Sequence, residues 1–150
     1  MTRDEDYMAL ALEQARAALA EGEIPVGAVI VKDGELLCSA RNARERGKSA
    51  LAHAELLAIE EACRILDGWR LAGCELFVTL EPCPMCAGAI INSRLERLVY
   101  GASDSKAGCV HSLISLFELP FNHRPIVKSG VLEAECGELL SSFFKTLRGK

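Results

Sequence analysis

The sequence predicts an α/β protein of the three-layer α/β/α class, built around a mixed five-stranded sheet. Its 150 residues are half apolar and a quarter charged, which predicts one globular domain over residues 1–150 with its own core. Helical and strand patterns alternate through most of the chain, so most strands should pair in parallel. One sharp turn near the start predicts an antiparallel hairpin, and this makes the sheet mixed.

The first part of the chain predicts a helix followed by a β-hairpin. Residues 6–20 place apolar side chains at helical spacing and charged side chains on another face. Two apolar runs, 26–31 and 35–40, then flank the dipeptide Asp33-Gly34. This dipeptide is typical of a two-residue hairpin turn, so the two runs should be neighbouring antiparallel strands.

The rest of the chain predicts helices and strands in alternation. Residues 53–66 form a helix whose buried face should carry Leu56, Ile59, Cys63 and Leu66. Pro84 suits the first turn of a later helix, and Pro120 should end a short one. The predicted elements are helix 53–66, strand 74–80, helix 83–93, strand 97–102, short helix 113–119, strand 125–131 and helix 133–147.

Composition excludes several classes of protein. The chain holds no apolar run long enough to cross a membrane, and its N-terminus, MTRDEDYM, lacks an apolar signal region. Seven cysteines are an odd number, which argues against a disulfide framework. We therefore expect a cytoplasmic protein with no membrane partner. Its formal charge of −4 gives no sign of nucleic-acid binding by the chain as a whole.

Two short motifs together predict a metal site. The first is His53-Ala54-Glu55, and the second is PCPMC, which supplies Cys83 and Cys86. Each motif lies at a predicted helix start, and cysteines at i and i+3 point the same way. A single C-x-x-C is weak evidence alone, but a histidine adds a third ligand of the kind that zinc prefers. Three protein ligands leave one position open, which is characteristic of a catalytic zinc site, with one zinc per chain.

Glu55 has a role if such a site exists. A carboxylate in the first helical turn can reach a metal lying off the helix end and exchange protons with substrate. The joint pattern H-x-E and P-C-x-x-C is typical of zinc deaminases that act on C4 of cytosine or C6 of adenine. The sequence therefore predicts a hydrolytic deaminase with Glu55 as its proton shuttle.

The chain also resembles the bacterial tRNA-specific adenosine deaminases. The matching stretches include EIPVGAVIV, AHAE, LFVTLEPCPMCAGAI, RLVYGA, DSKAG and FNHR. The resemblance implies a cytidine deaminase-like fold, a homodimer, and hydrolysis of the wobble adenosine to inosine in an arginine tRNA. It also implies that His53, Cys83 and Cys86 bind zinc and that Glu55 moves the proton. A dimer interface could use the AGAII run of helix 83–93, although this run could equally be core.

The resemblance assigns further residues to substrate. Asn42 matches a position that hydrogen-bonds the flipped nucleotide, but it could also be a strand-end asparagine in a turn. Val26 could be plain core, and the charges of Asp104 and Lys106 could simply be solvated. The implied substrate-binding residues are Pro25, Val26, Asn42, Ala54, Asp104 and Lys106.

Basic residues at two places could form an RNA rim. The loop RNARERGK, residues 41–48, carries four cations against Glu45 alone, and KTLRGK lies at the C-terminus. Such runs are often only solvated surface. His123 is an RNA or a structural contact, because a fourth protein ligand would close the zinc site. The candidate rim residues are Arg44, Arg46, Lys48, His123, Lys145 and Arg148.

Three other functions compete with this prediction. The nearest is a zinc-dependent deaminase of a free nucleobase or nucleoside, such as guanine, cytosine or cytidine. A zinc-stabilised RNA-binding protein without catalysis would have no use for Glu55. A thiol oxidoreductase could be built on Cys83 and Cys86, but it would leave His53 and Glu55 unexplained.

Overall fold

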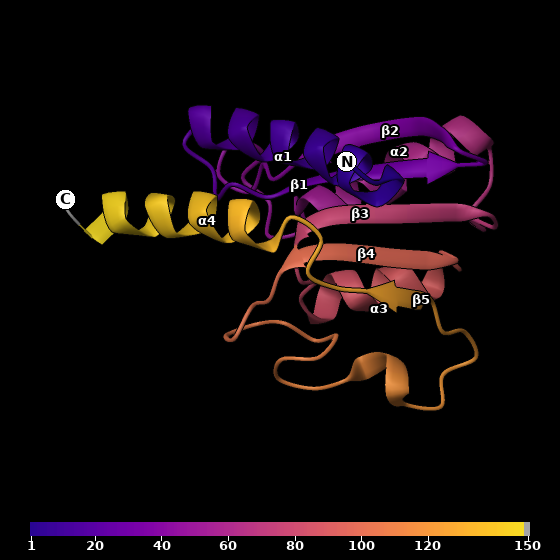
Figure 1. The fold of residues 1–150 in the computed structure, drawn as a ribbon. Coiled ribbons are helices and arrows are strands. Elements are labelled where there is room, and N and C mark those ends of the chain that lie inside the picture. The colour runs from indigo at the N-terminus through magenta and orange to yellow at the C-terminus, as the bar shows by residue number, and fades with distance from the viewer. Residues whose placement is uncertain (149–150) are drawn as a thin grey trace.

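The computed structural model describes residues 1–148, and side chains to residue 147. It contains one five-stranded sheet in the order β2-β1-β3-β4-β5 (Figure 1). Strand β1 pairs antiparallel with β2 and β3, whereas β3, β4 and β5 run parallel. The elements are α1 (Arg3–Ala20), β1 (Gly27–Lys32), β2 (Glu35–Arg41), α2 (Ala54–Leu66), β3 (Cys74–Leu80), α3 (Pro84–Asn92), β4 (Arg97–Ala102), the 3₁₀ helix η1 (Leu116–Glu118), β5 (Ile126–Lys128) and α4 (Glu133–Arg148).

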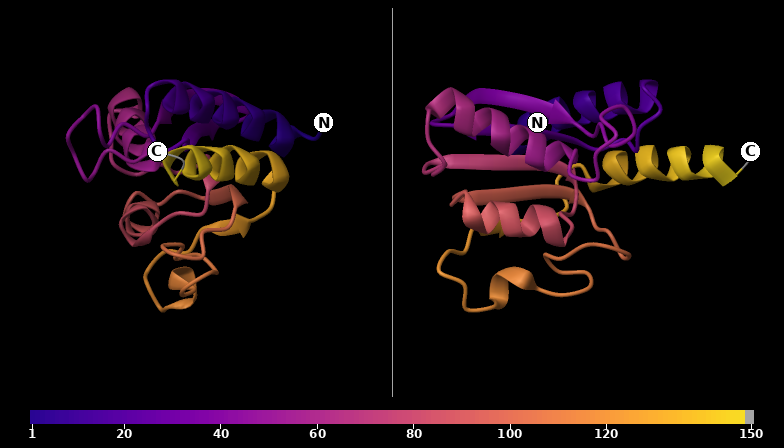
Figure 2. Two further views of the ribbon diagram at one scale, coloured as in Figure 1. Left: turned by 90° about the vertical axis from the view of Figure 1, so that its left-hand side faces the viewer. Right: turned by 180° about the vertical axis from the view of Figure 1, so that it is seen from behind.

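Helices cover both faces of the sheet. Helices α1 and α4 pack on one face, and α2 and α3 pack on the other (Figure 2). The predicted three-layer class and mixed sheet are therefore confirmed. Helix α4 also extends past the sheet, beyond the carboxyl ends of the parallel strands (Figure 1). Among residues 1–148, no helix is both long and apolar enough to span a membrane.

Three elements differ from the prediction by more than one residue at an end. Helix α1 begins at Arg3 instead of residue 6, because Thr2 and Glu5 form a reciprocal capping box. The predicted helix 113–119 is reduced to η1, and the predicted strand 125–131 is reduced to β5. Both segments belong to a long, largely exposed connection between β4 and α4, where few packed contacts enforce regular structure.

The buried face of α2 agrees with the prediction only at Ile59, which is buried. Leu56, Cys63 and Leu66 are half-buried, and the other buried residues of the helix are Ala54, Glu55, Ala58 and Ala62. Small side chains let the helix approach the sheet closely, as in other tightly packed interfaces. This close approach carries Glu55, a charged residue, into the interior.

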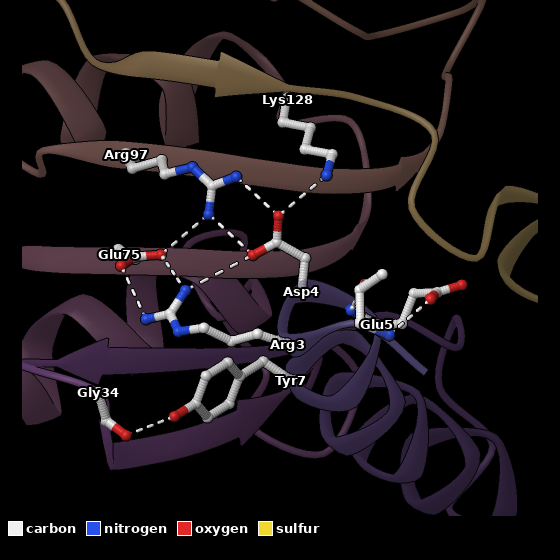
Figure 3. A network of polar contacts seen from close by, with 9 residues as sticks. Arg3, Asp4, Glu5, Tyr7, Gly34, Glu75, Arg97 and Lys128 are labelled. Carbon is white, nitrogen blue, oxygen red and sulfur yellow. Dashed lines mark hydrogen bonds and ion pairs between the residues drawn. The ribbon is translucent and has the colours of Figure 1, made fainter.

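A network of ion pairs ties α1 to the amino ends of β3 and β4 and to Lys128 of β5 (Figure 3). The Asp4 carboxylate accepts hydrogen bonds from the Arg97 guanidinium at 2.7 and 2.9 Å and from Lys128 at 3.1 Å. Arg97 also pairs with Glu75, which in turn pairs with Arg3. The hydrogen bonds from Arg97 outweigh burial and lower the pKa of Asp4 to about 2.

We expect Asp4→Asn to remove an acid-sensitive part of the stability. Asp4 binds a proton less readily in the folded chain than in the unfolded chain. Its contribution to the free energy of unfolding is therefore complete above the ordinary pKa of an aspartate, 3.8. That contribution disappears as the pH falls from 3.8 toward 2. At neutral pH the substitution should cost roughly 2 kcal/mol of unfolding free energy. Urea unfolding at several pH values should show the difference from the unsubstituted protein shrinking in acid, and a constant difference would contradict this account.

Candidate metal centre

The three predicted ligands meet where two helices begin. His53 is the N-cap of α2, Cys83 is the N-cap of α3, and Cys86 lies in the first turn of α3. The His53 Nδ1 atom lies 3.6 Å from Cys83 Sγ and 3.5 Å from Cys86 Sγ. All three ligand atoms lie within 4.8 Å of one another. Tetrahedral zinc with ordinary bond lengths would separate a nitrogen from a sulfur ligand by about 3.6 Å, so the donor set fits zinc.

The electrostatics of these ligands are tightly coupled. The hydrogen bond from the Cys86 thiol is the main reason that the pKa of Cys83 falls to about 4. The same hydrogen bond and burial raise the pKa of Cys86. The pKa of His53 is raised, mainly by its hydrogen bond to Cys83, while burial and the charge of Arg44 act in the opposite direction. Cys83 is thus held as a thiolate, the form that binds metals.

Glu55 lies beside this cluster but is not part of it. Its side chain is only 4% exposed, and burial raises its pKa to about 7. Cys86 and His53 are among the groups close enough to affect the charge of this carboxylate. A carboxyl group with a pKa near neutrality can both accept and return a proton. The structure therefore brings the predicted proton shuttle to the predicted ligands.

Asn42 lies at the end of β2 and is almost fully buried. Its Nδ2 atom donates to the Ile24 carbonyl at 3.2 Å, and its Oδ1 accepts from the Arg44 N–H at 3.2 Å. These bonds match the strand-end turn that was the alternative to substrate binding. Each polar atom of the amide retains capacity for one further hydrogen bond, so substrate contact stays a prediction.

The predicted pocket wall is buried. Val26 and Ala54 belong to the hydrophobic core, and Pro25 is buried beside them. Asp104 shapes its own loop, because its Oδ1 accepts hydrogen bonds from the Lys106 N–H at 3.0 Å and the Ala107 N–H at 3.2 Å. This arrangement leaves Lys106 exposed.

The predicted RNA rim divides into paired and more open cations. Arg46 is held by Glu21 at 2.7 Å, whereas Arg44 makes a long 4.0 Å pair with the exposed Glu45. Lys48 and Lys145 are exposed. The Arg148 side chain lies outside the described residues.

His123 lies away from the metal ligands. Its Nε2 atom lies 2.7 Å from the backbone carbonyl of Leu95, and the chain that follows it pairs with the amino end of β4. The metal ligands lie near the opposite, carboxyl end of β3. The structure thus favours the structural role of His123 over the predicted place in an RNA rim.

Two buried glutamates were missed by the sequence analysis. Glu23 is 1% exposed and accepts hydrogen bonds from the N–H groups of Glu45 and Arg46. Glu81 is 2% exposed and accepts five hydrogen bonds from residues 104–112. Burial alone would raise the pKa of Glu81, but the His111 N–H and the Ser112 hydroxyl help to lower it to about 2. No local pattern distinguishes these two glutamates from exposed ones, because their hydrogen-bond donors lie 22 residues or more later in the chain.

Comparisons with known proteins agree with this site. Residues 1–102 match the cytidine and deoxycytidylate deaminase zinc-binding region. The chain is 54% identical to the tRNA-specific adenosine deaminase of Bacillus subtilis (strain 168), with all of this chain and 94% of that protein covered. A solved structure from a study of A-to-I editing by tRNA:A34 deaminases shares 45% identity and a TM-score of 0.88, covering 90% of this chain and 99% of the other.

A guanine deaminase from Nitrosomonas europaea is more distant. It shares 28% identity and a TM-score of 0.76, with 93% of this chain and 83% of that chain covered. Both deaminase structures share the fold, but the identity to the tRNA deaminases is much higher. With its zinc-spaced donor set and full-length relatives, the chain belongs to the tRNA-specific adenosine deaminase family of the zinc-binding cytidine and deoxycytidylate deaminases.

Proposed function

We propose that the protein hydrolyses the wobble adenosine in the anticodon loop of a tRNA, specifically an arginine tRNA, to inosine. The main support for this reaction is the buried Glu55 carboxylate beside His53, Cys83 and Cys86, whose ligand atoms are spaced as in a zinc site. The choice of RNA rests on the full-length relatives, whose names specify tRNA and adenosine.

The residues of the site suit hydrolysis at C6 of adenine. His53, Cys83 and Cys86 would hold one zinc per chain, which supplies activation of water. Glu55 accepts a proton from the attacking water and returns it as the amino group leaves. The C6–N bond breaks, a C6–O bond forms, and the products are inosine and ammonia. Single-stranded loop bases can be turned out into such a site, whereas paired bases first have to be unstacked.

A free-base deaminase is the second candidate, since the Nitrosomonas europaea guanine deaminase shares the fold. The deciding experiment compares an anticodon stem-loop, its DNA counterpart, free adenosine, guanine and cytosine as substrates for one zinc-loaded preparation. We expect inosine from the RNA stem-loop at a rate well above any other substrate. Deamination of a free base at an equal or higher rate would overturn the proposal in favour of the second candidate.

The RNA contacts that we propose come from local cations, because the chain carries a net charge of −4. Arg44 lies near His53, and Lys106 lies in the loop beside Cys83. Lys48, Lys145 and Arg148 would extend the basic surface. Asn42 would use the remaining capacity of its amide to bind the nucleotide, with Pro25, Val26 and Ala54 behind the base and Asp104 shaping the loop around it.

Arg44→Ala should weaken binding of the stem-loop and flatten its salt dependence. Loss of one phosphate contact lowers the slope of log affinity against log salt by about one unit, and zinc content should not change. Arg46→Ala should have the smaller effect, because that guanidinium is already held by Glu21, which also pairs with Arg41. Arg64→Ala is a matched control, since Arg64 is an exposed arginine near the far end of α2. Equal effects of Arg44→Ala and Arg64→Ala, measured by fluorescence anisotropy, would contradict the assignment.

We also propose a homodimer, but not through the predicted AGAII run, because Ile90 and Ile91 are buried in the chain's own core. Exposed apolar side chains lie instead in the segment that connects β4 to β5, at Leu113, Ile114, Leu119 and Phe121. A second copy covering these residues would remove apolar surface from water. Light scattering should give about twice the 16.2 kDa chain mass, and Leu113→Asp/Ile114→Asp should give the monomer. A monomeric unsubstituted protein would contradict this proposal.

A cytoplasmic location and a single domain over residues 1–150 complete the proposal. All seven cysteines, which lie among the described residues, are free thiols, as expected in a reducing compartment. tRNA is also the substrate that the relatives' names specify.

A further inference from the structure

Glu81 is a buried carboxylate with no place among the predicted ligands. It follows β3 and precedes Pro82-Cys83, so it joins the sheet to the metal centre. Its carboxylate is not available as a metal ligand, because both oxygens accept hydrogen bonds from one distant loop, residues 103–112.

The donors divide between the two carboxylate oxygens. Oε1 accepts from the Asp104 N–H at 3.0 Å and from the Ser112 hydroxyl. Oε2 accepts from the N–H groups of Val110, His111 and Ser112 at 3.1, 2.9 and 3.0 Å. Hydrogen bonds to an ionised acceptor are about twice as strong as neutral ones. One side chain thus satisfies the backbone at both ends of the loop.

The loop is closely fitted around this carboxylate. A Cβ atom added to Gly108 would lie 2.4 Å from Glu81 Cδ and 2.5 Å from the Asp104 carbonyl oxygen. Only glycine can therefore occupy position 108 while the loop keeps its bonds to Glu81. The requirement for glycine here comes from close approach and not from a positive φ angle.

The same loop lies against the metal centre. The Cys109 N–H donates to the Pro82 carbonyl at 2.9 Å, directly before the ligand Cys83. At the other side of the loop, Asp104 turns the backbone so that Lys106 is exposed. A shift of the loop would therefore move the exposed Lys106 without removing a metal ligand.

We infer that Glu81 is a positioning residue for substrate binding, which fixes loop 103–112 and its Lys106 ammonium beside the metal centre. This inference rests on the proposed RNA substrate. Glu81 acts through the loop and is not a member of the ligand cluster. Its removal should therefore raise KM for the RNA and leave kcat almost unchanged.

Two variants test the inference from opposite sides of the same contact. Glu81→Gln keeps the volume but replaces one acceptor oxygen with an amide NH2 group, which cannot accept hydrogen bonds from the loop's N–H groups. Gly108→Ala leaves Glu81 intact but forces the loop off it. Because Gly108→Ala does not change the residues that precede Cys83, it covers the case in which Glu81→Gln fails to fold.

Asp4→Asn is the matched control. Asp4 is also a buried carboxylate that accepts several charge-assisted hydrogen bonds (Figure 3). Its partner Arg97 begins β4, whereas Glu81 follows the carboxyl end of β3, so the two carboxylates lie at opposite ends of the sheet. The Asp4→Asn substitution should lower the stability of the protein without changing KM for the stem-loop. Zinc content, kcat and KM on the stem-loop, and hydrogen exchange of residues 104–112 are measured for all three variants and the unsubstituted protein.

We expect Glu81→Gln and Gly108→Ala to raise KM about tenfold, the loss of roughly one charge-assisted hydrogen bond, with kcat changed less than about threefold. Both should keep zinc and show faster exchange in the loop. An unchanged KM in these variants of an active enzyme, a loss confined to kcat, or an equal rise in KM in Asp4→Asn would overturn the inference alone. An unsubstituted protein that does not deaminate the stem-loop would overturn the proposed function and this inference together.

Discussion

Glu55→Ala should abolish turnover while leaving the metal centre intact. The side chain is buried beside the ligands but is not one of them, so zinc content should match that of the unsubstituted protein. Removal of a general acid/base lowers the rate by about 10²-fold or more. Inosine formation under single-turnover conditions measures the chemical step directly, and the affinity for the stem-loop should change little.

Glu60→Ala provides the control for this experiment. Glu60 lies on the same helix, but its side chain is exposed, so its loss should change neither zinc content nor rate. Normal turnover by Glu55→Ala would show that another group moves the proton. Loss of zinc from that variant would instead place Glu55 among the ligands.

Cys86→Ser should lose zinc and stability together. A metal that binds only the folded chain adds its binding free energy to folding. A ligand present at about a hundred times its dissociation constant contributes about 3 kcal/mol, so thermal unfolding should occur at a clearly lower temperature. Elemental analysis should find one zinc per chain in the unsubstituted protein and almost none in the variant.

Cys63→Ser separates the loss of a ligand from the loss of a thiol. Cys63 is half-buried on α2 and is not part of the ligand cluster. This variant should keep its zinc and most of its stability. Full zinc occupancy in Cys86→Ser would contradict the ligand assignment.

The clustering of His53, Cys83 and Cys86 could be predicted because it depends on local features of the chain. His53 and Cys83 each lie at the start of a helix. The i, i+3 spacing of Cys83 and Cys86 makes their side chains point the same way. The start of α1 could also have been predicted, since Thr2 and Glu5 have the spacing of a capping box. These features depend on neighbours a few residues away in the chain.

The missed features depend on partners far away in the chain. Glu81 is ionised in the interior only because donors 23 to 31 residues later surround it, and no local pattern shows this. The buried face of α2 consists mainly of alanines because the sheet lies close to the helix, and sequence periodicity does not reveal how close two elements pack. Asn42 has the residue type of both a turn and a substrate contact, so its type could not decide between them.

The two N-caps bear on how far this protein can be stabilised. Within the described residues, neither His53 nor Cys83 makes the side-chain hydrogen bond that a serine or aspartate would make at a helix start. Such a cap is typically worth about 1 kcal/mol, so the chain gives up that amount at each helix in return for a ligand. Stabilising substitutions selected without zinc should therefore arise at positions 53 and 83 and should inactivate the enzyme, a conflict between stability and activity confined to two residues.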